Sequence, residues 1–352
     1  MLEELLPKDN ENIPLFDLGP LAPTEPLGFR PEQMVACNEC DRSNPPTRVS
    51  CLYCGTALPT DEKTASLQRP TLRALESWEQ GYSNILFPEP SVAPSVKYDE
   101  AAKLLKLDQQ LLERIVASNI PLPLALAATH EEASLVKTRL DDLGLRTLVI
   151  SDAELGLDRS APVRARSFNF EADSIVANPS GGGDPVHLSG NSLSLIVQGR
   201  LIITTTEVKE QKQAHKESEI VDSSETYTDE AVMDVYSQGS NSSIRISANN
   251  FDFSCLKDKK GLLATENFAR LIKLITEHAP KATLDETYKS ARQLLEQVWP
   301  SERQTESSGW RRERFGRYSV GSKTQLNNER QFTRYSRLRN YLNINRHLYE
   351  ID

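Results

Sequence analysis

The spacing of hydrophobic residues along the chain changes period twice. From residue 98 to residue 116 they recur at steps of three and four, which is typical of amphipathic helices. From residue 166 they alternate with polar residues, which predicts strands of an antiparallel sheet. Over 265–278 the helical period returns, with Phe268, Leu271, Ile272 and Ile275 on one face. We therefore expect an α+β protein with more than one folded domain.

The first patterned region contains the elements of a βαβ unit. An apolar segment, 121–128, precedes an amphipathic helix over 133–143, and a second strand-like segment follows at 146–150. Thr129 and Glu132 have the spacing of a capping box at the start of that helix. This order, which we assign to a unit over 98–158, resembles the ferredoxin-like α/β modules in which a helix covers two parallel strands.

The second patterned region, 163–300, is expected to form an antiparallel β-rich domain with a helical cap at its C-terminal end. A charged, proline-free stretch, 207–230, interrupts the alternation and is interpreted as a long acidic loop. Strands followed by one amphipathic helix resemble a pleckstrin-homology-like fold. That resemblance implies a binding role, because such folds offer loops and a sheet edge to their ligands.

Two proline-rich segments lie outside these regions. Residues 1–34 are expected to form an extended arm, because the first thirty residues carry prolines at positions 7, 14, 20, 23 and 26. Residues 61–97 are expected to be a linker that contains a hydrophobic docking segment. In that segment Leu72, Leu75 and Trp78 are predicted to form one face of a short helix, which either packs on a neighbouring domain or binds a peptide partner.

Four cysteines, at 37, 40, 51 and 54, form a C-x2-C-x10-C-x2-C array. Two residues between cysteines let consecutive thiolates bind one ion from a tight knuckle, and two such knuckles complete a tetrahedral shell of sulfur atoms. The array therefore predicts one structural zinc ion held by Cys37, Cys40, Cys51 and Cys54. Because all four positions are cysteine, no position is left open for a catalytic water.

The segment from Cys37 to Leu58 resembles the small zinc ribbons of many prokaryotic proteins, a resemblance that covers residues 35–60. It implies that Asn44 to Pro46 form the bend between the knuckles, that Gly55 has a positive φ and that Leu58 completes a very small core. The spacing is also similar to the Ran-binding type of zinc finger. That family has a tryptophan where this chain has Val35, so we favour the ribbon.

Two disulfides are the alternative interpretation of the array. The first six residues are acidic and apolar without the basic region of a secretory signal, which favours a reducing, cytoplasmic compartment in which thiolates persist. The longest apolar runs are much shorter than the ~20 residues that a membrane helix requires. We therefore expect no membrane span.

The net charge of −9 conceals a basic C-terminal segment, 301–352. Arginines and aromatic residues are interleaved there, and this combination can neutralise phosphates and stack bases. Over 328–342, Phe332, Tyr335, Leu338 and Leu342 form one helical stripe. The segment is interpreted as a basic aromatic tail that docks on its own chain or a partner subunit, binds nucleic acid, or binds an anionic membrane surface. The candidate contact residues are Trp310, Arg311, Arg312, Arg314, Arg317, Arg330, Arg334 and Arg337.

No residue pattern of a catalytic site stands out. The five histidines, at 130, 187, 215, 278 and 347, are scattered, and Cys255 is interpreted as a small buried hydrophobic residue. We therefore expect a zinc-binding, non-catalytic adaptor or regulatory protein that binds an unidentified protein partner. The alternatives are a nucleic-acid-associated protein that uses the ribbon and the tail, and an enzyme whose site is assembled from residues distant in sequence.

Overall fold

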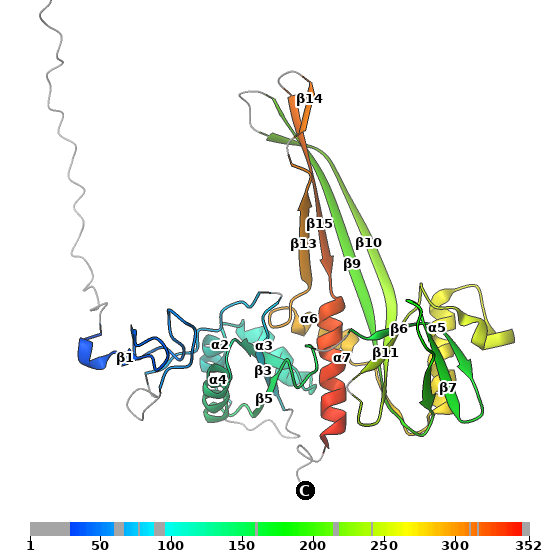
Figure 1. Cartoon of the computed structure of the whole chain (residues 1–352), viewed down its shortest axis with the longest axis horizontal. Helices are drawn as coiled ribbons and strands as arrows, with labels where there is room; N and C mark the ends of the chain where they lie inside the picture. Colours follow the sequence, from blue (N-terminus) through cyan, green and yellow to red (C-terminus); the bar gives the residue numbers. More distant parts are fainter. Residues whose placement is uncertain are drawn as a thin grey trace, which may run out of the picture. The chain divides into compact units, whose positions relative to one another are not determined.

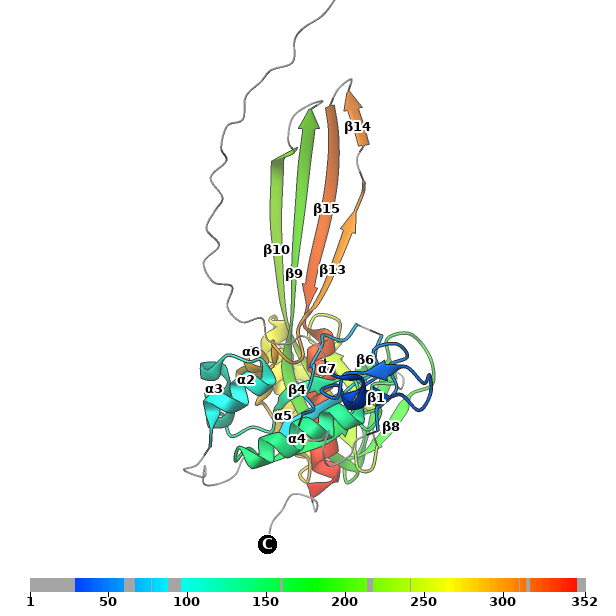
Figure 2. The ribbon, with the colours of Figure 1, turned by 90° about the vertical axis from the view of Figure 1, so that its left-hand side faces the viewer.

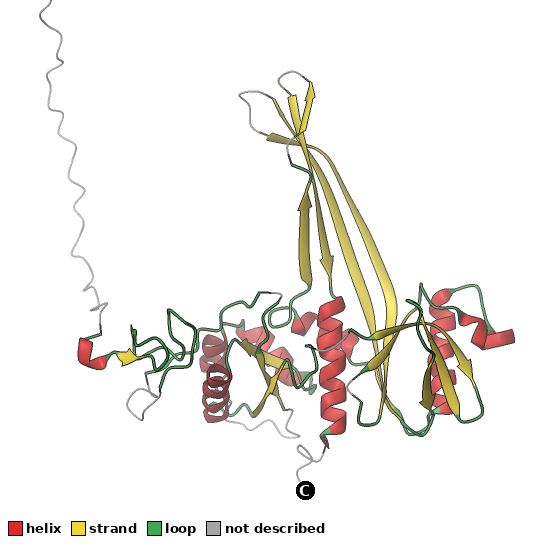
Figure 3. Cartoon of the chain, in the orientation of Figure 1, coloured by secondary structure: helices red, strands yellow, loops and turns green. Residues whose placement is uncertain are grey.

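A computed structural model describes residues 29–59, 67–76, 78–87, 96–158, 161–213, 218–240, 242–309, 311–314 and 317–346. The chain forms two compact units, Met1–Arg69 and Pro70–Asp352, and its fold is mixed α/β (Figures 1 and 3). The first 28 residues of the predicted proline-rich arm lie outside the described residues. None of the described helices has the length and hydrophobicity that a membrane crossing requires.

The described part of the first unit is small. A 3-10 helix, η1 (Pro31–Gln33), precedes strands β1 (Val35–Ala36) and β2 (Ser43–Asn44), which pair antiparallel. Its core consists of Cys37, Cys51 and Leu58, each at most 5% exposed. A core of this size cannot stabilise a fold alone, so the unit depends on a cross-link or an ion.

The second unit contains a three-stranded sheet with the order β4-β3-β5, formed by β3 (Tyr82–Leu86), β4 (Pro123–Ala127) and β5 (Thr147–Ser151). Both outer strands are antiparallel to β3. Helices α2 (Tyr98–Leu105), α3 (Gln109–Ala117) and α4 (His130–Asp142) accompany this sheet. The predicted strand, helix, strand order is present as β4, α4 and β5, but β3 lies between the two parallel strands.

Strand β3 comes from the segment that the sequence predicts to be a linker. The structure has no helix over 72–76, and Trp78 is 78% exposed. Instead, Ile85 and Leu86 are buried in the centre of the sheet. Ser83 and Asn84 are buried beside them. Because these two buried residues are polar, the segment lacks the hydrophobic pattern from which a strand would be predicted.

A ten-stranded sheet dominates the second unit. Its main path follows the order β13-β15-β9-β10-β11-β6-β7-β8, with β12 paired to β9 and β14 paired to β15. The strands are β6 (Val163–Phe170), β7 (Ser174–Pro179), β8 (Val186–Ser189), β9 (Leu193–Gln213), β10 (Ser218–Ser237), β11 (Ser243–Ser247), β12 (Thr283–Asp285), β13 (Glu302–Ser307), β14 (Arg311–Arg314) and β15 (Arg317–Asn327).

The predicted acidic loop over 207–230 is wrong, because β9 and β10 run through most of this stretch as a paired hairpin. The reason is compositional. Its side chains are mostly polar on both faces of the strands, so the alternation that normally identifies a half-buried strand is absent. Isolated threonines, valines, Ile220 and Tyr227, all with high β-propensity, remain as the local signal.

Helices cover both faces of the sheet where β9 and β10 begin and end. Helices α6 (Tyr288–Leu295) and α7 (Glu329–Ile344) cover one face, and α5 (Ala264–His278) with the 3-10 helix η2 (Phe253–Lys259) covers the other. Phe332 of α7 packs so closely on Gly199 of β9 that a Cβ there would lie 2.4 Å from its ring. The predicted face of Phe268, Leu271, Ile272 and Ile275 on α5 is buried, as expected.

The C-terminal segment is not a separate tail over its described residues. Strands β13, β14 and β15 extend the large sheet, and α7 is a core helix. The predicted stripe of Phe332, Tyr335, Leu338 and Leu342 is buried. The sequence leaves open whether this segment docks on its own chain or a partner subunit, binds nucleic acid or binds a membrane. In the structure, α7 docks on its own chain.

Candidate metal centre and interaction surfaces

The four cysteines lie on two knuckles with the same backbone geometry. In the first, the Asp41 N–H donates to the Cys37 carbonyl, and in the second the Gly55 N–H donates to the Cys51 carbonyl. Asp41 and Gly55 both have positive φ, 55° and 77°. The resemblance to a zinc ribbon predicts the conformation of Gly55, and Asp41 is its equivalent in the first knuckle.

Asn44 connects the two knuckles. Its side chain is fully buried, donates from Nδ2 to the Arg42 carbonyl at 2.8 Å and to Cys51 Sγ at 3.4 Å, and accepts from the Leu52 N–H at 2.8 Å. The bend predicted at Asn44 is therefore also a hydrogen-bonding centre. Such outer contacts orient the atoms that bind a metal.

The four sulfur atoms have the spacing of a tetrahedral metal shell. All lie within 4.8 Å of one another, with Cys37 Sγ 3.5 Å from Cys54 Sγ and Cys40 Sγ 3.6 Å from Cys51 Sγ. A zinc ion with Zn–S bonds of about 2.3 Å requires sulfur atoms about 3.8 Å apart. All four cysteines are free thiols, so the cluster could hold a metal ion.

Neighbouring amides favour the ionised form of one sulfur. Burial opposes ionisation of Cys51, but hydrogen bonds from the Cys54 and Tyr53 amides and from Asn44 outweigh it and lower the pKa of Cys51 to about 6. Hydrogen bonds from Thr56 lower the pKa of Cys54 in the same way. The same hydrogen bonds would also stabilise the negative charge on a sulfur that is bound to a cation.

The pKa of Cys40 shifts in the opposite direction. A backbone hydrogen bond at Arg42 favours its thiolate, but burial and the adjacent thiols of Cys51, Cys54 and Cys37 raise the pKa to about 12. Four thiolates this close repel one another, so a bound cation is needed to stabilise all of them. With four protein ligands, such an ion has no open position for substrate, which fits a structural role.

The large sheet extends beyond the helices that cover its base. We call this extension the β-arm and define it as residues 202–213, 218–229, 302–307, 311–314 and 317–327, the outer portions of β9, β10, β13, β14 and β15 (Figures 1 and 2). None of its residues with described burial is buried. The 11 residues of β15 alone span roughly 36 Å at ~3.3 Å per residue.

The predicted contact residues of the C-terminal segment fall into two groups. Arg311 and Arg312 are exposed on β14 of the β-arm, and Arg314 and Arg317 lie in β14 and β15. Trp310 lies outside the described residues. The second group, Arg330, Arg334 and Arg337, belongs to α7.

The α7 arginines are engaged within the chain. Arg330 pairs with Glu302 at 3.1 Å and Arg334 with Asp152 at 2.7 Å. The Arg334 side chain is 7% exposed, and Arg337, which donates to the Gly156 carbonyl, is also buried. Sequence reasoning could identify the arginines of this helix but not the acidic partners, which lie more than 150 residues away for Arg334.

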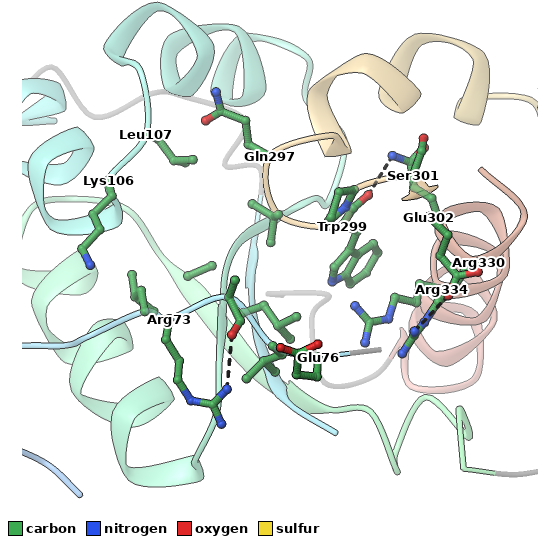
Figure 4. A pocket seen from close by; sticks show the side chains of 18 of the residues that line it. Arg73, Glu76, Lys106, Leu107, Gln297, Trp299, Ser301, Glu302, Arg330 and Arg334 are labelled. Carbon is green, nitrogen blue, oxygen red and sulfur yellow. Dashed lines mark hydrogen bonds and ion pairs between the residues drawn. The ribbon is translucent and has the colours of Figure 1, made fainter. Parts of the chain in front are cut away.

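A pocket of about 660 Å³ lies beside α7 (Figure 4). Trp299, Arg330 and Arg334 lie on one side of it, and Arg73, Lys106 and Leu107 on the other. Its volume is in the range of small-molecule sites.

The charges around this pocket are largely compensated. Arg73 forms two hydrogen bonds with Glu79, which lower the pKa of that carboxyl to about 2. Burial lowers the pKa of Arg334, an effect that Asp152 opposes. The residues that line the pocket include no histidine or cysteine. The pocket therefore has the size of a binding site without a recognisable set of reacting groups.

The described histidines do not converge on a site. His130 begins α4, His187 lies on β8 and His278 ends α5, while His215 and His347 lie outside the described residues. Cys255 is half-buried in η2, and burial raises the pKa of its thiol to about 11. That thiol is protonated at neutral pH, which makes it a poor nucleophile.

Comparisons with protein-family models, with curated proteins and with solved structures gave no match to this chain.

Proposed function

We propose that this chain is a zinc-binding, non-catalytic adaptor that acts through protein–protein interaction, with the β-arm as its main interaction surface. The four-cysteine cluster holds one structural zinc ion in a ribbon fold, and the compartment is a reducing one such as the cytoplasm, where free thiolates remain available.

The exposure of the β-arm is the observation that carries this proposal. A sheet is normally covered on at least one face, because its strands bury hydrophobic side chains there. In the β-arm, Ile220, Val221 and Tyr227 are 66%, 48% and 63% exposed. A chain that maintains such a projecting sheet has a surface suited to contact with another protein.

The zinc ribbon contributes a second, smaller surface. Leu52 and Tyr53, between the cysteines of the second knuckle, are 53% and 56% exposed, and Arg42 lies over the Tyr53 ring at 4.7 Å. The ion fixes the backbone that presents these side chains, so metal binding and recognition are coupled.

A variant with a shortened β-arm tests the proposal. Thr205 pairs with Thr226 and Gln304 with Gln325 across their hairpins, so each pair can be joined by a two-residue Asn-Gly turn. We expect tagged full-length protein, recovered from its native cells after reversible crosslinking, to carry specific proteins that the short-arm variant loses.

The matched control keeps the β-arm and substitutes Glu210→Lys on the central strand β9, which changes charge without removing surface. It should retain the crosslinked proteins. An identical set of proteins on the full-length and short-arm forms would contradict the assignment of the β-arm as the interaction surface.

Nucleic-acid binding is the second candidate, favoured by the two exposed arginines at 311 and 312. If it is correct, Arg311→Glu should weaken binding to single-stranded RNA or DNA and reduce the dependence of affinity on salt concentration. Fluorescence anisotropy at several salt concentrations measures both. Unchanged affinity and slope would eliminate this candidate.

A further inference from the structure

The β-arm has two open edges. In the sheet order, β10 is followed by β11 only along Val232–Tyr236, so within the described residues its segment 218–229 has no strand on its outer side. On the opposite edge, β13 and β14 pair with β15 and with no other strand in the part of the chain that the structure describes. Long, unprotected edges are rare in proteins, because their free N–H and C=O groups pair with other strands.

The outer ends of the two edges carry opposite charge. The open segment of β10, residues 218–229, contains four acidic and no basic residues. On the opposite edge, β14 contains three basic and one acidic residue, whereas β13 contains one basic and two acidic residues. The central strand β9 is balanced over its outer part, with Glu207 and Glu210 against Lys209 and Lys212.

The directions of the strands also match. Strand β10 is antiparallel to β9, β9 is antiparallel to β15, and β15 is antiparallel to β13 and β14. Therefore β13 and β14 run opposite to β10. If a second copy lies beside the first with its β-arm pointing the same way, the two facing edges form one more antiparallel pair, and the sheet continues across the join.

The register places complementary residues at the same height on the two edges. Residues paired in register form rows across the sheet. From the β10 edge to the opposite edge, one row consists of Glu219, Gln211, Ser319 and Arg311, and another consists of Tyr227, Thr204, Leu326 and Arg303. Directly opposite residues in an antiparallel sheet point to the same face. An unstaggered second copy would therefore place Glu219 opposite Arg311 and Tyr227 opposite Arg303, an ion pair and a cation–π pair.

We propose that the partner of the β-arm is a second copy of this chain, with the acidic β10 edge of one copy paired to the β13–β14 edge of the next, which is basic along β14. This inference deepens the proposed function and rests on the β-arm being an interaction surface. The contact is heterologous, since two different edges meet, so each copy keeps one free edge for another. Repetition then gives a closed ring or an open fibre rather than a symmetric dimer.

Charge reversal on one edge at a time tests this proposal. The acidic-edge variant carries Glu219→Lys and Glu225→Lys, and the basic-edge variant carries Arg303→Glu and Arg311→Glu. All four side chains are exposed, so neither variant disturbs the core. Sedimentation velocity of the purified full-length chain at tens of micromolar should show assemblies several times the 39.4 kDa monomer. Each variant alone should sediment as a monomer.

An equimolar mixture of the two variants provides the decisive result. At the level of residues 219 and 311, the first variant is basic on both edges and the second is acidic on both edges, so a mixture should restore assemblies of alternating composition. Restoration also demonstrates that both variants are folded. The Glu210→Lys control on β9 should assemble like the unmodified chain.

A monomeric unmodified chain, or assemblies unaffected by either reversal, would overturn the proposal. These outcomes are separate from the test of the adaptor function. If the unmodified chain is monomeric but loses crosslinked proteins when the β-arm is shortened, the adaptor function stands and self-pairing fails. If the chain assembles through its edges but crosslinks only to itself, self-pairing stands and the adaptor function fails.

Discussion

At the scale of single residues, a few buried polar side chains determine the structure. Asn44 binds both knuckles of the cysteine cluster, and Arg245 forms two hydrogen bonds of 2.8 Å with Asp234. The sequence predicts the cysteine ligands because their spacing is itself the signal. It does not predict the pairing of Arg245 with Asp234, since nothing local distinguishes these two charged residues from exposed ones.

Replacing Asn44 with alanine should weaken metal binding. The substitution removes an N–H donor to Cys51 Sγ and leaves the Leu52 amide without its acceptor. Loss of such an outer contact typically lowers metal affinity about 10- to 100-fold. Competition for zinc against a coloured chelator measures the change, and Asn38→Ala, at an exposed position in the first knuckle, is the control that should have no effect.

Replacing Asp234 with asparagine should strongly destabilise the second unit. Arg245 is 1% exposed and would keep only Glu329, at 3.1 Å, as an acidic partner. Removing one member of a buried pair costs about 3–5 kcal/mol, because the remaining charge stays buried.

The matched control for this substitution is Asp229→Asn on the same strand. Its partner Arg200 lies at 2.6 Å, but the side chains of Arg200 and Asp229 are 41% and 31% exposed. That change should cost less than about 1 kcal/mol in urea unfolding. If the two variants lost equal free energy of unfolding, the buried Arg245–Asp234 pair would be no more important for stability than the exposed Arg200–Asp229 pair.

At the scale of elements, hydrophobic periodicity predicts those with one buried face and misses the others. Helices α4 and α5 and the covered parts of the large sheet follow the predicted pattern. Strand β3 is missed because its buried residues include two polar ones, and the outer halves of β9 and β10 are missed because both of their faces are mostly polar. In both cases the strand forms because it pairs with neighbouring strands, and not because it buries one hydrophobic face.

Shortening the β-arm should leave the stability of the base almost unchanged. The residues removed between Thr205 and Thr226 and between Gln304 and Gln325 include none that is described as buried. Little hydrophobic surface is therefore lost, and most of the effect comes from backbone hydrogen bonds and cross-strand pairs. Thermal unfolding followed by circular dichroism should shift by only a few degrees relative to the Arg303→Glu, Arg311→Glu variant, which keeps the full β-arm and should be monomeric. Collapse of the whole unit would contradict this account.

At the scale of the whole molecule, the chain consists of two units with different sources of stability. The second unit has large hydrophobic clusters, whereas the core of the first is little more than Cys37, Cys51 and Leu58. The sequence predicts this contrast, because only the ribbon segment lacks a hydrophobic pattern and has metal-binding spacing. It does not predict that the basic C-terminal segment completes the core and the β-arm, since that depends on partners distant in sequence.

Replacing Cys40 with serine should unfold the first unit and leave the second intact. Structural zinc contributes on the order of 10 kcal/mol to small modules of this kind. Hydrogen exchange should accelerate over residues 35–58 and remain unchanged in α7 and β9. Cys255→Ser, outside the cluster, is the control that keeps the metal. Faster exchange throughout the chain would show that the two units do not fold independently.

The most direct test of the account is native mass spectrometry of the full-length and short-arm proteins, each recovered from its native cells and measured with its metal content. We predict one zinc ion per chain in both forms, with bound protein present on the full-length form and absent from the short-arm form. Absence of metal from both, or the same bound proteins on both, would contradict the claim that this chain is a zinc-binding adaptor that works through its β-arm.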